Sequence, residues 1–211
     1  MLKIYYSDNH IIVCEKPFGV SSQKSSGDNM VDMLSEQLDS DVYPVHRLDT
    51  TTTGLMIFAK NEKSAKALSN DIANHKFEKE YLVICHGKTE KEGEMRDFLF
   101  HDRIKNKSFV VDGKRKGSKE AVLQYERVNE DKENGLSLVR VRLLTGRTHQ
   151  IRVQFAYRGN MLYGDGKYGA KDNDRIALHS CALEVFHPVT REKMSFQSLP
   201  EGKIWSGLMA E

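Results

Sequence analysis

The residues best suited to chemistry lie in one short stretch, residues 46–60, which reads HRLDTTTTGLMIFAK. A histidine, an arginine and Asp49 form a charged cluster, and four threonines separate it from an apolar run that begins at Leu55. Such a run between a glycine and a lysine is typical of a buried strand. Because packing of the strand limits the movement of the preceding loop, Asp49 lies where a reactive carboxylate could be held in place.

The residues alone leave a second interpretation of Asp49 open. An aspartate in a turn often pairs with a neighbouring arginine, here Arg47, without any function. In catalysis a carboxylate can serve as a nucleophile or as a general acid or base. Further motifs along the chain bear on this choice.

Five ordered segments of the chain resemble the motifs of one enzyme family. They are KPFGV at 16–20, HRLD with its threonine-rich continuation at 46–60, KEYLV at 79–83, GRTHQIRV at 146–153 with GD at 164–165 and YG at 168–169, and LH at 178–179 with HP at 187–188. Together they resemble the RluA family of RNA pseudouridine synthases over roughly residues 5–200. The one departure is Thr53, where a serine is common, and this change keeps a hydroxyl in place.

The resemblance implies that Asp49 is the catalytic residue and that an arginine orients it. The family's arginine at the end of RTHQIR pairs with the catalytic carboxylate and keeps it ionised, and the matching residue is Arg152. Without the family, Arg152 would be interpreted as a helix-surface arginine. The sequence leaves open whether Asp49 attacks the anomeric carbon, attacks the uracil ring or deprotonates the ribose.

The resemblance also implies residues that bind the RNA. A uridine stacked in RNA must be flipped out before it can react, at a cost of roughly a few kcal/mol. By resemblance Arg47 enters the space that the base leaves, Tyr81 stacks on the target base, and Leu178 packs against its other side. Arg147 is a further candidate, for a phosphate near a helix start. From the residues alone, Tyr81 is an ordinary strand aromatic and Leu178 a core residue.

The elements that must position these residues include both helices and strands. Periodicity predicts helices over 29–38, with Asp28 as a possible N-cap, over 62–74 after the N-cap Asn61, and over 148–158. Strands are predicted at 4–6, 11–15, 55–59, 81–86, 121–128, 136–144, 177–182, 183–186 and 194–197. Their irregular order predicts an α+β fold with a mixed, mostly antiparallel central sheet. The resemblance implies the same pseudouridine synthase fold, with flanking helices and a catalytic cleft.

Charge is concentrated in one segment, although the whole chain carries a formal net charge of only +2. Residues 101–119 hold seven cations against two aspartates, among them Lys114, Arg115 and Lys116. We expect this segment to contact RNA phosphates and to influence the choice of substrate. The alternative is a solvated hairpin that lysines keep soluble.

Composition argues against several other classes of protein. No apolar run approaches the length of a membrane span, and the N-terminus lacks a signal-peptide core, so we expect a cytoplasmic location. Cys14, Cys85 and Cys181 lie within predicted strands and are expected to be buried free thiols. No cysteine or histidine spacing suits a metal, and the isomerisation of uridine needs no cofactor.

With 211 residues and no linker-like stretch, we expect a single catalytic domain over residues 1–211, acting as a monomer without an appended N-terminal RNA-binding domain. The leading hypothesis is an isomerase acting on ribosomal or transfer RNA. A non-catalytic RNA-binding or RNA-chaperone protein is the alternative, although it would not need Asp49, Arg152 and Tyr81 together. A nucleoside or glycoside hydrolase is a third, but the paired carboxylates of such enzymes are not evident near Asp49.

Overall fold

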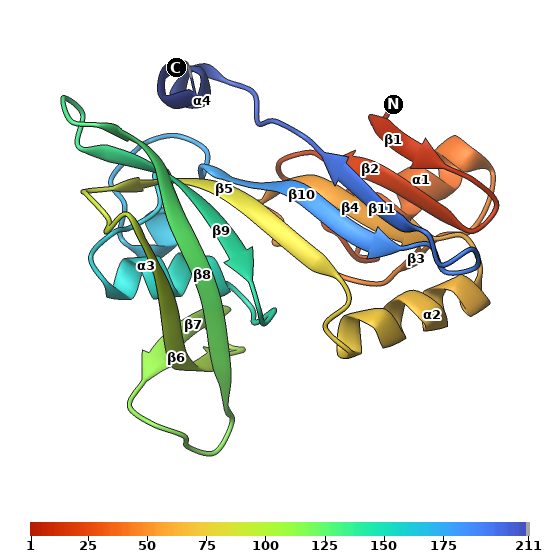
Figure 1. Ribbon diagram of the computed structural model, residues 1–211, viewed down its shortest axis with the longest axis horizontal. Helices are drawn as coiled ribbons and strands as arrows, with labels where there is room; N and C mark the ends of the chain where they lie inside the picture. Colours follow the sequence, from red (N-terminus) through yellow and green to blue (C-terminus); the bar gives the residue numbers. More distant parts are fainter. Residues whose placement is uncertain (210–211) are drawn as a thin grey trace. The chain divides into compact units, whose positions relative to one another are not determined.

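The computed structural model describes residues 1–209 and divides the chain into two compact units. The first unit comprises residues 1–79 and 179–200, and the second comprises residues 80–178 and the chain from Glu201 onward. Figure 1 shows the elements of both, and each unit is described by itself. The single catalytic domain over residues 1–211 stays a prediction, and residues 210–211 lie outside the described part.

The sheet of the first unit has four strands in one row and two shorter additions. The row is β1 (Ile4–Ser7), β2 (Ile11–Lys16), β4 (Thr53–Ala59) and β10 (Leu178–Phe186), with β3 (Tyr43–Pro44) paired to β4 and β11 (Lys193–Gln197) paired to β10. Strands β4 and β10 are parallel, and the other pairs of this unit are antiparallel. Strand β10 therefore brings distant sequence next to the strand that follows the HRLD motif.

Two capped helices complete the first unit. In α1 (Met30–Leu38) the Asn29 side chain accepts a hydrogen bond from the backbone of Asp32, so the predicted cap at Asp28 is wrong by one residue. Asn61 caps α2 (Glu62–Ala73), as predicted. Both predicted helices are confirmed. Leu68 of α2 joins a buried cluster with apolar residues of β2, β4 and β10.

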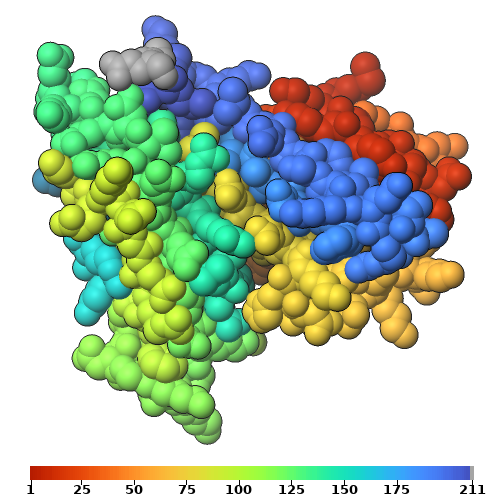
Figure 2. All heavy atoms as spheres, viewed as in Figure 1, coloured from red at the N-terminus to blue at the C-terminus, as the bar shows by residue number. Residues whose placement is uncertain are grey.

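The second unit is built on an antiparallel sheet. Its strand order is β5 (Glu78–His86), β9 (Leu136–Leu143), β8 (Ser118–Asp131), β6 (Glu92–Asp102) and β7 (Lys107–Val111). Helix α3 (Gln150–Tyr157) packs against β6, β7 and the 3-10 turn η1 (Gly166–Tyr168), and α4 (Lys203–Met209) packs against β8 and β9. The loop between β7 and β8 projects from the rest of this unit (Figures 1 and 2).

The predicted α+β class with a mixed, mostly antiparallel sheet is confirmed. One detail is wrong, because the strands predicted at 177–182 and 183–186 form the single strand β10. The reason is a change of partner along its length: His179 pairs with β4, whereas the stretch Ala182 to Phe186 pairs with β11. The predicted helix at 148–158 is confirmed with a shorter extent.

The other compositional predictions can be compared with the described residues. Cys14, Cys85 and Cys181 are buried free cysteines within strands, as predicted. Among the helices of residues 1–209, none is both long and apolar enough to cross a membrane. Within the same residues, no group of three or more histidine, cysteine or acidic side chains is arranged to hold a metal ion.

Candidate active site

The loop that carries Asp49, residues 46–52, is fixed through its backbone carbonyls; it is called the catalytic loop below, after the role that the resemblance implies for Asp49. The carbonyl of Leu48 accepts a hydrogen bond of 2.9 Å from the hydroxyl of Ser22, and the carbonyl of Thr50 accepts one of 2.9 Å from the backbone of Gly19. The carbonyl of Asp49 itself accepts 2.9 Å from the backbone of Thr52, which closes a turn. The chain is thus anchored on both sides of a half-buried aspartate.

Lys16, at the end of β2, adds the strongest anchor. Its side chain is 0 % exposed, and its Nζ donates to the carbonyls of Pro17 (2.8 Å), Val20 (2.8 Å) and Thr50 (3.1 Å). Burial lowers the pKa of Lys16 to about 8, while the charge of Asp49 opposes that shift. Because all three ammonium protons have carbonyl acceptors, the lysine ties the KPFGV segment to the catalytic loop.

A polar chain holds Thr53, the first residue of β4, directly after the catalytic loop. Thr53 Oγ1 lies 2.8 Å from His179 Nδ1, His179 Nε2 lies 3.1 Å from Ser198 Oγ, and Ser198 Oγ donates to Glu15 at 3.0 Å. Burial lowers the pKa of His179 to about 4, so the imidazole is neutral near pH 7. Since Ser198 donates to Glu15, His179 donates through Nε2 and accepts from Thr53 through Nδ1.

The first residue of the HRLD motif is structural. His46 Nε2 accepts a hydrogen bond of 3.1 Å from the backbone of Ile57 in β4, and its ring lies 5.2 Å from that of Phe77. Desolvation lowers the pKa of His46 to about 3, and the nearby Lys79 contributes. A neutral imidazole that accepts from a strand backbone joins the motif to the sheet.

Arg47 differs from the residues around it because its side chain is exposed. The interpretation of Arg47 and Asp49 as a simple turn pair stays open beside the one that the resemblance implies. An exposed guanidinium beside an anchored carboxylate is available to a ligand. Its insertion into RNA stays a prediction.

In the second unit, Arg152 is buried in an ion pair. Its Nε and Nη2 donate to the two oxygens of Asp165, each at 2.7 Å, and the side chains are 6 % and 2 % exposed. The guanidinium also lies 5.2 Å from the ring of Tyr168. The interpretation of Arg152 as a helix-surface arginine is therefore wrong. Its pairing with Asp49 stays a prediction.

Tyr81 and Leu178 are both buried, at 5 % and 4 % exposure. Tyr81 is in β5 opposite Val141 of β9, and Leu178 begins β10 directly after Ala177, whose carbonyl accepts from Ile84 of β5. Burial agrees with either the core role or the predicted contact with a flipped base. Their contact with a base stays a prediction.

The basic segment 101–119 forms the end of β6, the strand β7, the loops beside them and the first two residues of β8, and is called the basic ribbon below. Lys114, Arg115 and Lys116 are exposed in the β7–β8 loop, and the Arg115 guanidinium lies 5.2 Å from the ring of Phe100. The ribbon thus consists of strands and loops of the second unit that carry exposed cations. Contact with phosphate stays a prediction.

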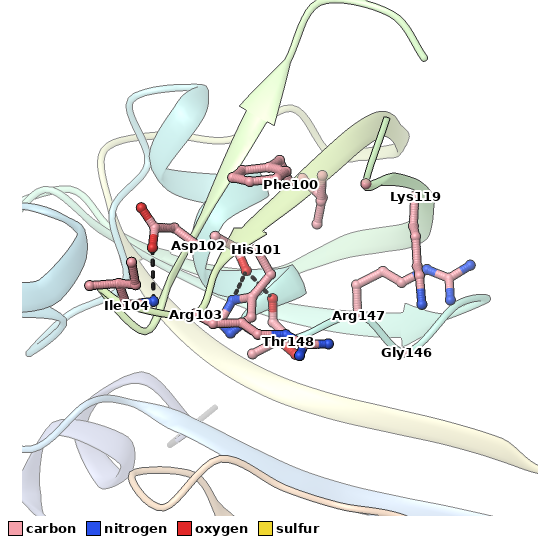
Figure 3. A pocket seen from close by; sticks show the side chains of 12 residues that line it. Phe100, His101, Asp102, Arg103, Ile104, Lys119, Gly146, Arg147 and Thr148 are labelled. Atoms are coloured by element: carbon pink, nitrogen blue, oxygen red, sulfur yellow. Dashed lines mark hydrogen bonds between the residues drawn. The ribbon is translucent and has the colours of Figure 1, made fainter. Parts of the chain in front are cut away.

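Arg147 lines a pocket of about 730 Å³ formed by the ribbon and the segment before α3, which Figure 3 shows. Its lining includes Gly117 of the β7–β8 loop but not Lys114, Arg115 or Lys116. The Nε of Arg147 donates 2.8 Å to the carbonyl of Glu120. Lys119 and Arg103 line the same pocket.

Sequence reasoning assigned no role to three residues that the structure makes prominent. Asp165 belongs to the matched GD pair, and Lys16 and His179 belong to the matched KPFGV and LH segments. The sequence indicated these residues only through their positions in matched motifs. The structure shows what they contact: Lys16 and His179 hold the catalytic loop and Thr53 after it, and Asp165 holds Arg152.

Solved structures define the class of fold. The structure named Human RNA Pseudouridylate Synthase Domain Containing 1 matches with a TM-score of 0.81 and 21% sequence identity, covering 95% of this chain and 84% of that chain. Human RNA Pseudouridylate Synthase Domain Containing 4 matches with a TM-score of 0.77 and 20% identity, covering 93% and 87% of the two chains. The chain therefore has the fold of pseudouridine synthases.

Sequence comparisons identify the family. Residues 10–157 match the family described as RNA pseudouridylate synthase. The tRNA pseudouridine synthase C of Haemophilus ducreyi is 31% identical, over 94% of this chain and 90% of the relative. Ribosomal large subunit pseudouridine synthase D of Buchnera aphidicola subsp. Baizongia pistaciae is also 31% identical, over 93% and 68%. The chain belongs to the RNA pseudouridylate synthase family and is an isomerase that converts uridine in RNA to pseudouridine.

Proposed function

We propose that Asp49 is the catalytic residue of this isomerisation and that the substrate is a transfer RNA or a ribosomal RNA. The observation that carries the first part is the anchoring of the backbone on both sides of a half-buried Asp49 by Ser22, Gly19 and Lys16. The names of the relatives support the second part, because they act on tRNA or on the large ribosomal subunit.

The reaction requires little more than a positioned carboxylate. The bond from uracil N1 to ribose C1′ breaks, the bond from C5 to C1′ forms, and the hydrogen of C5 leaves as a proton while N1 gains one. Atoms and charges balance without an oxidant. An anchored carboxylate can bond reversibly to the substrate or move a proton at the ribose, and rigid placement raises the rate of either step.

The roles of the remaining residues follow the family resemblance. Arg152, held by Asp165, would orient the carboxylate of Asp49, and exposed Arg47 would fill the space that the flipped uridine leaves. Tyr81 and Leu178 would enclose the uracil ring. For this to happen the two units must act as one catalytic domain, and we propose that they do so as a monomer.

The test is tritium release from RNA labelled at carbon 5 of uracil, with transfer and ribosomal RNA offered separately. We expect wild-type protein to release tritium from one class. Asp49→Asn should release less than about one ten-thousandth of that rate, since it removes both nucleophile and base. RNA affinity should stay within about threefold, because phosphate contacts dominate affinity.

Asp41→Asn is the matched control, since Asp41 is an exposed aspartate of the same unit. It should release tritium at the wild-type rate. Normal turnover by Asp49→Asn would disprove the assignment of the catalytic residue. Free uracil among the products would instead indicate hydrolysis, and RNA binding without release from either RNA would favour a non-catalytic protein.

A further inference from the structure

The pocket of about 730 Å³ in the second unit is built from segments that are distant in sequence. Its walls come from the end of β6 and the turn after it, from the start of β8, and from the residues before α3. Tyr81 and Leu178 of the same unit are absent from its lining. The pocket is therefore distinct from these two residues, which are predicted to enclose the target base.

Three cations line this pocket, one from each of its walls. Arg103 comes from the turn after β6, Lys119 from β8, and Arg147 from the segment before α3 (Figure 3). Within residues 1–209, none of the three forms an ion pair. The one carboxylate in the lining is Asp102, and it accepts from the backbones of Ile104 and Lys105 at 2.9 and 3.0 Å. The pocket is therefore positively charged.

Other arginines of the same unit behave differently. Each of a set of five pairs with a carboxylate of its own unit: Arg96 with Glu94 and Glu120, Arg127 with Glu130, Arg140 with Glu80, Arg152 with Asp165, and Arg158 with Asp97. Since carboxylates are plentiful in this unit, the unneutralised cations of the pocket indicate a site for an anion from outside the chain.

The pocket also has apolar walls. Leu99, the half-buried ring of Phe100 and Ile104 contribute to the lining, and Ile104 is 99 % exposed. An inorganic anion would leave this apolar surface in water, whereas a nucleobase would cover it. Aromatic side chains beside cations are the usual platform for unpaired bases of RNA. A volume of this size also suits a ligand as large as one or two nucleotides.

We propose that this pocket binds an unpaired nucleotide of the substrate RNA other than the target uridine. Its base would lie against Phe100, and Arg103, Lys119 and Arg147 would contact the phosphates next to it. This inference rests on the proposed function, because it assigns a second contact to the same RNA. The pocket would help to select the RNA by requiring an unpaired nucleotide at a fixed place in the substrate.

The first measurement is RNA affinity across a series of KCl concentrations, with the RNA class that releases tritium. We expect Arg103→Gln with Lys119→Gln to bind about tenfold more weakly at 150 mM salt. The slope of log affinity against log salt should become shallower by about 1.4, since each lost phosphate contact on a single strand contributes about 0.7. The matched control is Lys91→Gln with Lys132→Gln, two exposed lysines of the same unit outside the pocket. The RNA affinity of this control variant should stay within twofold of the wild-type affinity.

The Phe100→Leu variant distinguishes the binding of a nucleotide in the pocket from the binding of a bare phosphate. Loss of stacking should weaken binding about fivefold and leave the salt slope unchanged, because no charge is removed. Unchanged affinity of this variant would overturn the assignment of a base to the pocket.

Chemical protection tests the site in unmodified protein. Acetylation of Lys119, followed by mass spectrometry, should slow at least threefold when RNA is added, and inorganic phosphate should not protect it. Lys91 should react equally under all conditions. If the pocket variant matches its control and RNA leaves Lys119 unprotected while wild-type protein still releases tritium, the inference is wrong and the proposed function stands. Absence of tritium release from wild-type protein would contradict the proposed function itself.

Discussion

The catalytic loop of the first unit and the basic ribbon of the second carry polar residues that are built in opposite ways. In the loop, the carbonyls of Leu48 and Thr50 on either side of Asp49 accept hydrogen bonds from the buried side chains of Ser22 and Lys16. In the ribbon, every cation except the half-buried Lys107 is exposed, and Lys114, Arg115 and Lys116 lie on a projecting loop. The catalytic loop fixes the position of one carboxylate, whereas the basic ribbon distributes positive charge over an exposed surface.

The difference teaches what each region contributes. A reacting carboxylate must stay within fractions of an ångström of its place, so its supports are short, buried and numerous. Phosphates are recognised through charge over several ångströms of water, so exposed and mobile cations suffice. Substitutions in the loop should therefore change turnover, whereas substitutions in the ribbon should change affinity and its salt dependence.

The largest effect is expected at Arg152, a cation of the second unit that is buried instead of exposed. Asp165→Asn removes the carboxylate that binds it at 2.7 Å, and should lower the free energy of unfolding by about 3–5 kcal/mol. Urea unfolding measures this. The control is Glu80→Gln, whose pair with Arg140 is half exposed and should contribute less than about 1 kcal/mol. Equal effects would show that burial does not distinguish the two pairs.

Lys16→Met tests whether the anchors of the catalytic loop act on turnover. The variant keeps the length of the side chain but removes three hydrogen bonds to carbonyls. We expect kcat to fall about a hundredfold, equivalent to about 2.7 kcal/mol, while RNA affinity stays within threefold. Steady-state tritium release provides kcat, and circular dichroism confirms folding. A folded variant with normal kcat would remove Lys16 from the support of Asp49.

Protonation of His179 tests the polar chain directly after the catalytic loop. The folded pKa is about 4 and the ordinary value is 6.5, so the unfolded chain binds the proton first as the pH falls. This contribution to stability is present above pH 6.5 and is lost toward pH 4, at up to about 1.4 kcal/mol per pH unit.

His179→Gln lacks this titration, so the stability advantage of wild-type protein over the variant should shrink between pH 7 and pH 5. Urea unfolding at each pH measures it. The control is Ser40→Ala, which replaces an exposed residue of the same unit that does not titrate and should give a constant difference. A constant difference for His179→Gln as well would contradict the assigned protonation state.

The smallest effect on the protein itself is expected in the β7–β8 loop. Replacement of Lys114, Arg115 and Lys116 by glutamine should leave the free energy of unfolding nearly unchanged, because all three side chains are exposed. The kcat should stay within about twofold of the wild-type value. The slope of log affinity against log salt should become shallower by up to about 2. Filter binding across a salt series measures this slope. Unchanged binding would exclude the loop from the RNA footprint and leave phosphate contact to the pocket lined by Lys119.

Local patterns predicted most of the fold of the first unit. Periodicity located α1 and α2, and the apolar run after Gly54 located β4. Strand β10 was predicted as two adjacent strands; its continuity was missed because its two halves have different partners, and no local pattern encodes partners that are distant in sequence. Strand β6 and helix α4 were also not predicted, since EGEMRDFLFHD mixes charged and apolar residues and KIWSGLM is short and contains a glycine.

The candidate site was predictable as a set of motif positions, and much less as a set of contacts. The burial of Arg152 depends on Asp165, which lies thirteen residues further along the chain. The complete burial of Lys16 depends on carbonyls in two separate loops. A side chain that sequence patterns place at the surface becomes internal when the fold brings acceptors to it. Such acceptors can be identified only once the fold is known.

The parallel pairing of β4 with β10 has a consequence for how the protein is made. Gly54 has a φ of +107°, and a Cβ there would meet the backbone carbonyl of Ser180, so the two strands fit closely at the start of β4. The ribosome finishes β4 well over a hundred residues before it begins β10. At roughly 5–20 residues per second, the nascent first unit waits for several seconds or longer before Thr53 and Gly54 of β4 gain their partners in β10. The hydroxyl of Thr53 meets His179 only after that interval, so the catalytic loop reaches its final form late in synthesis.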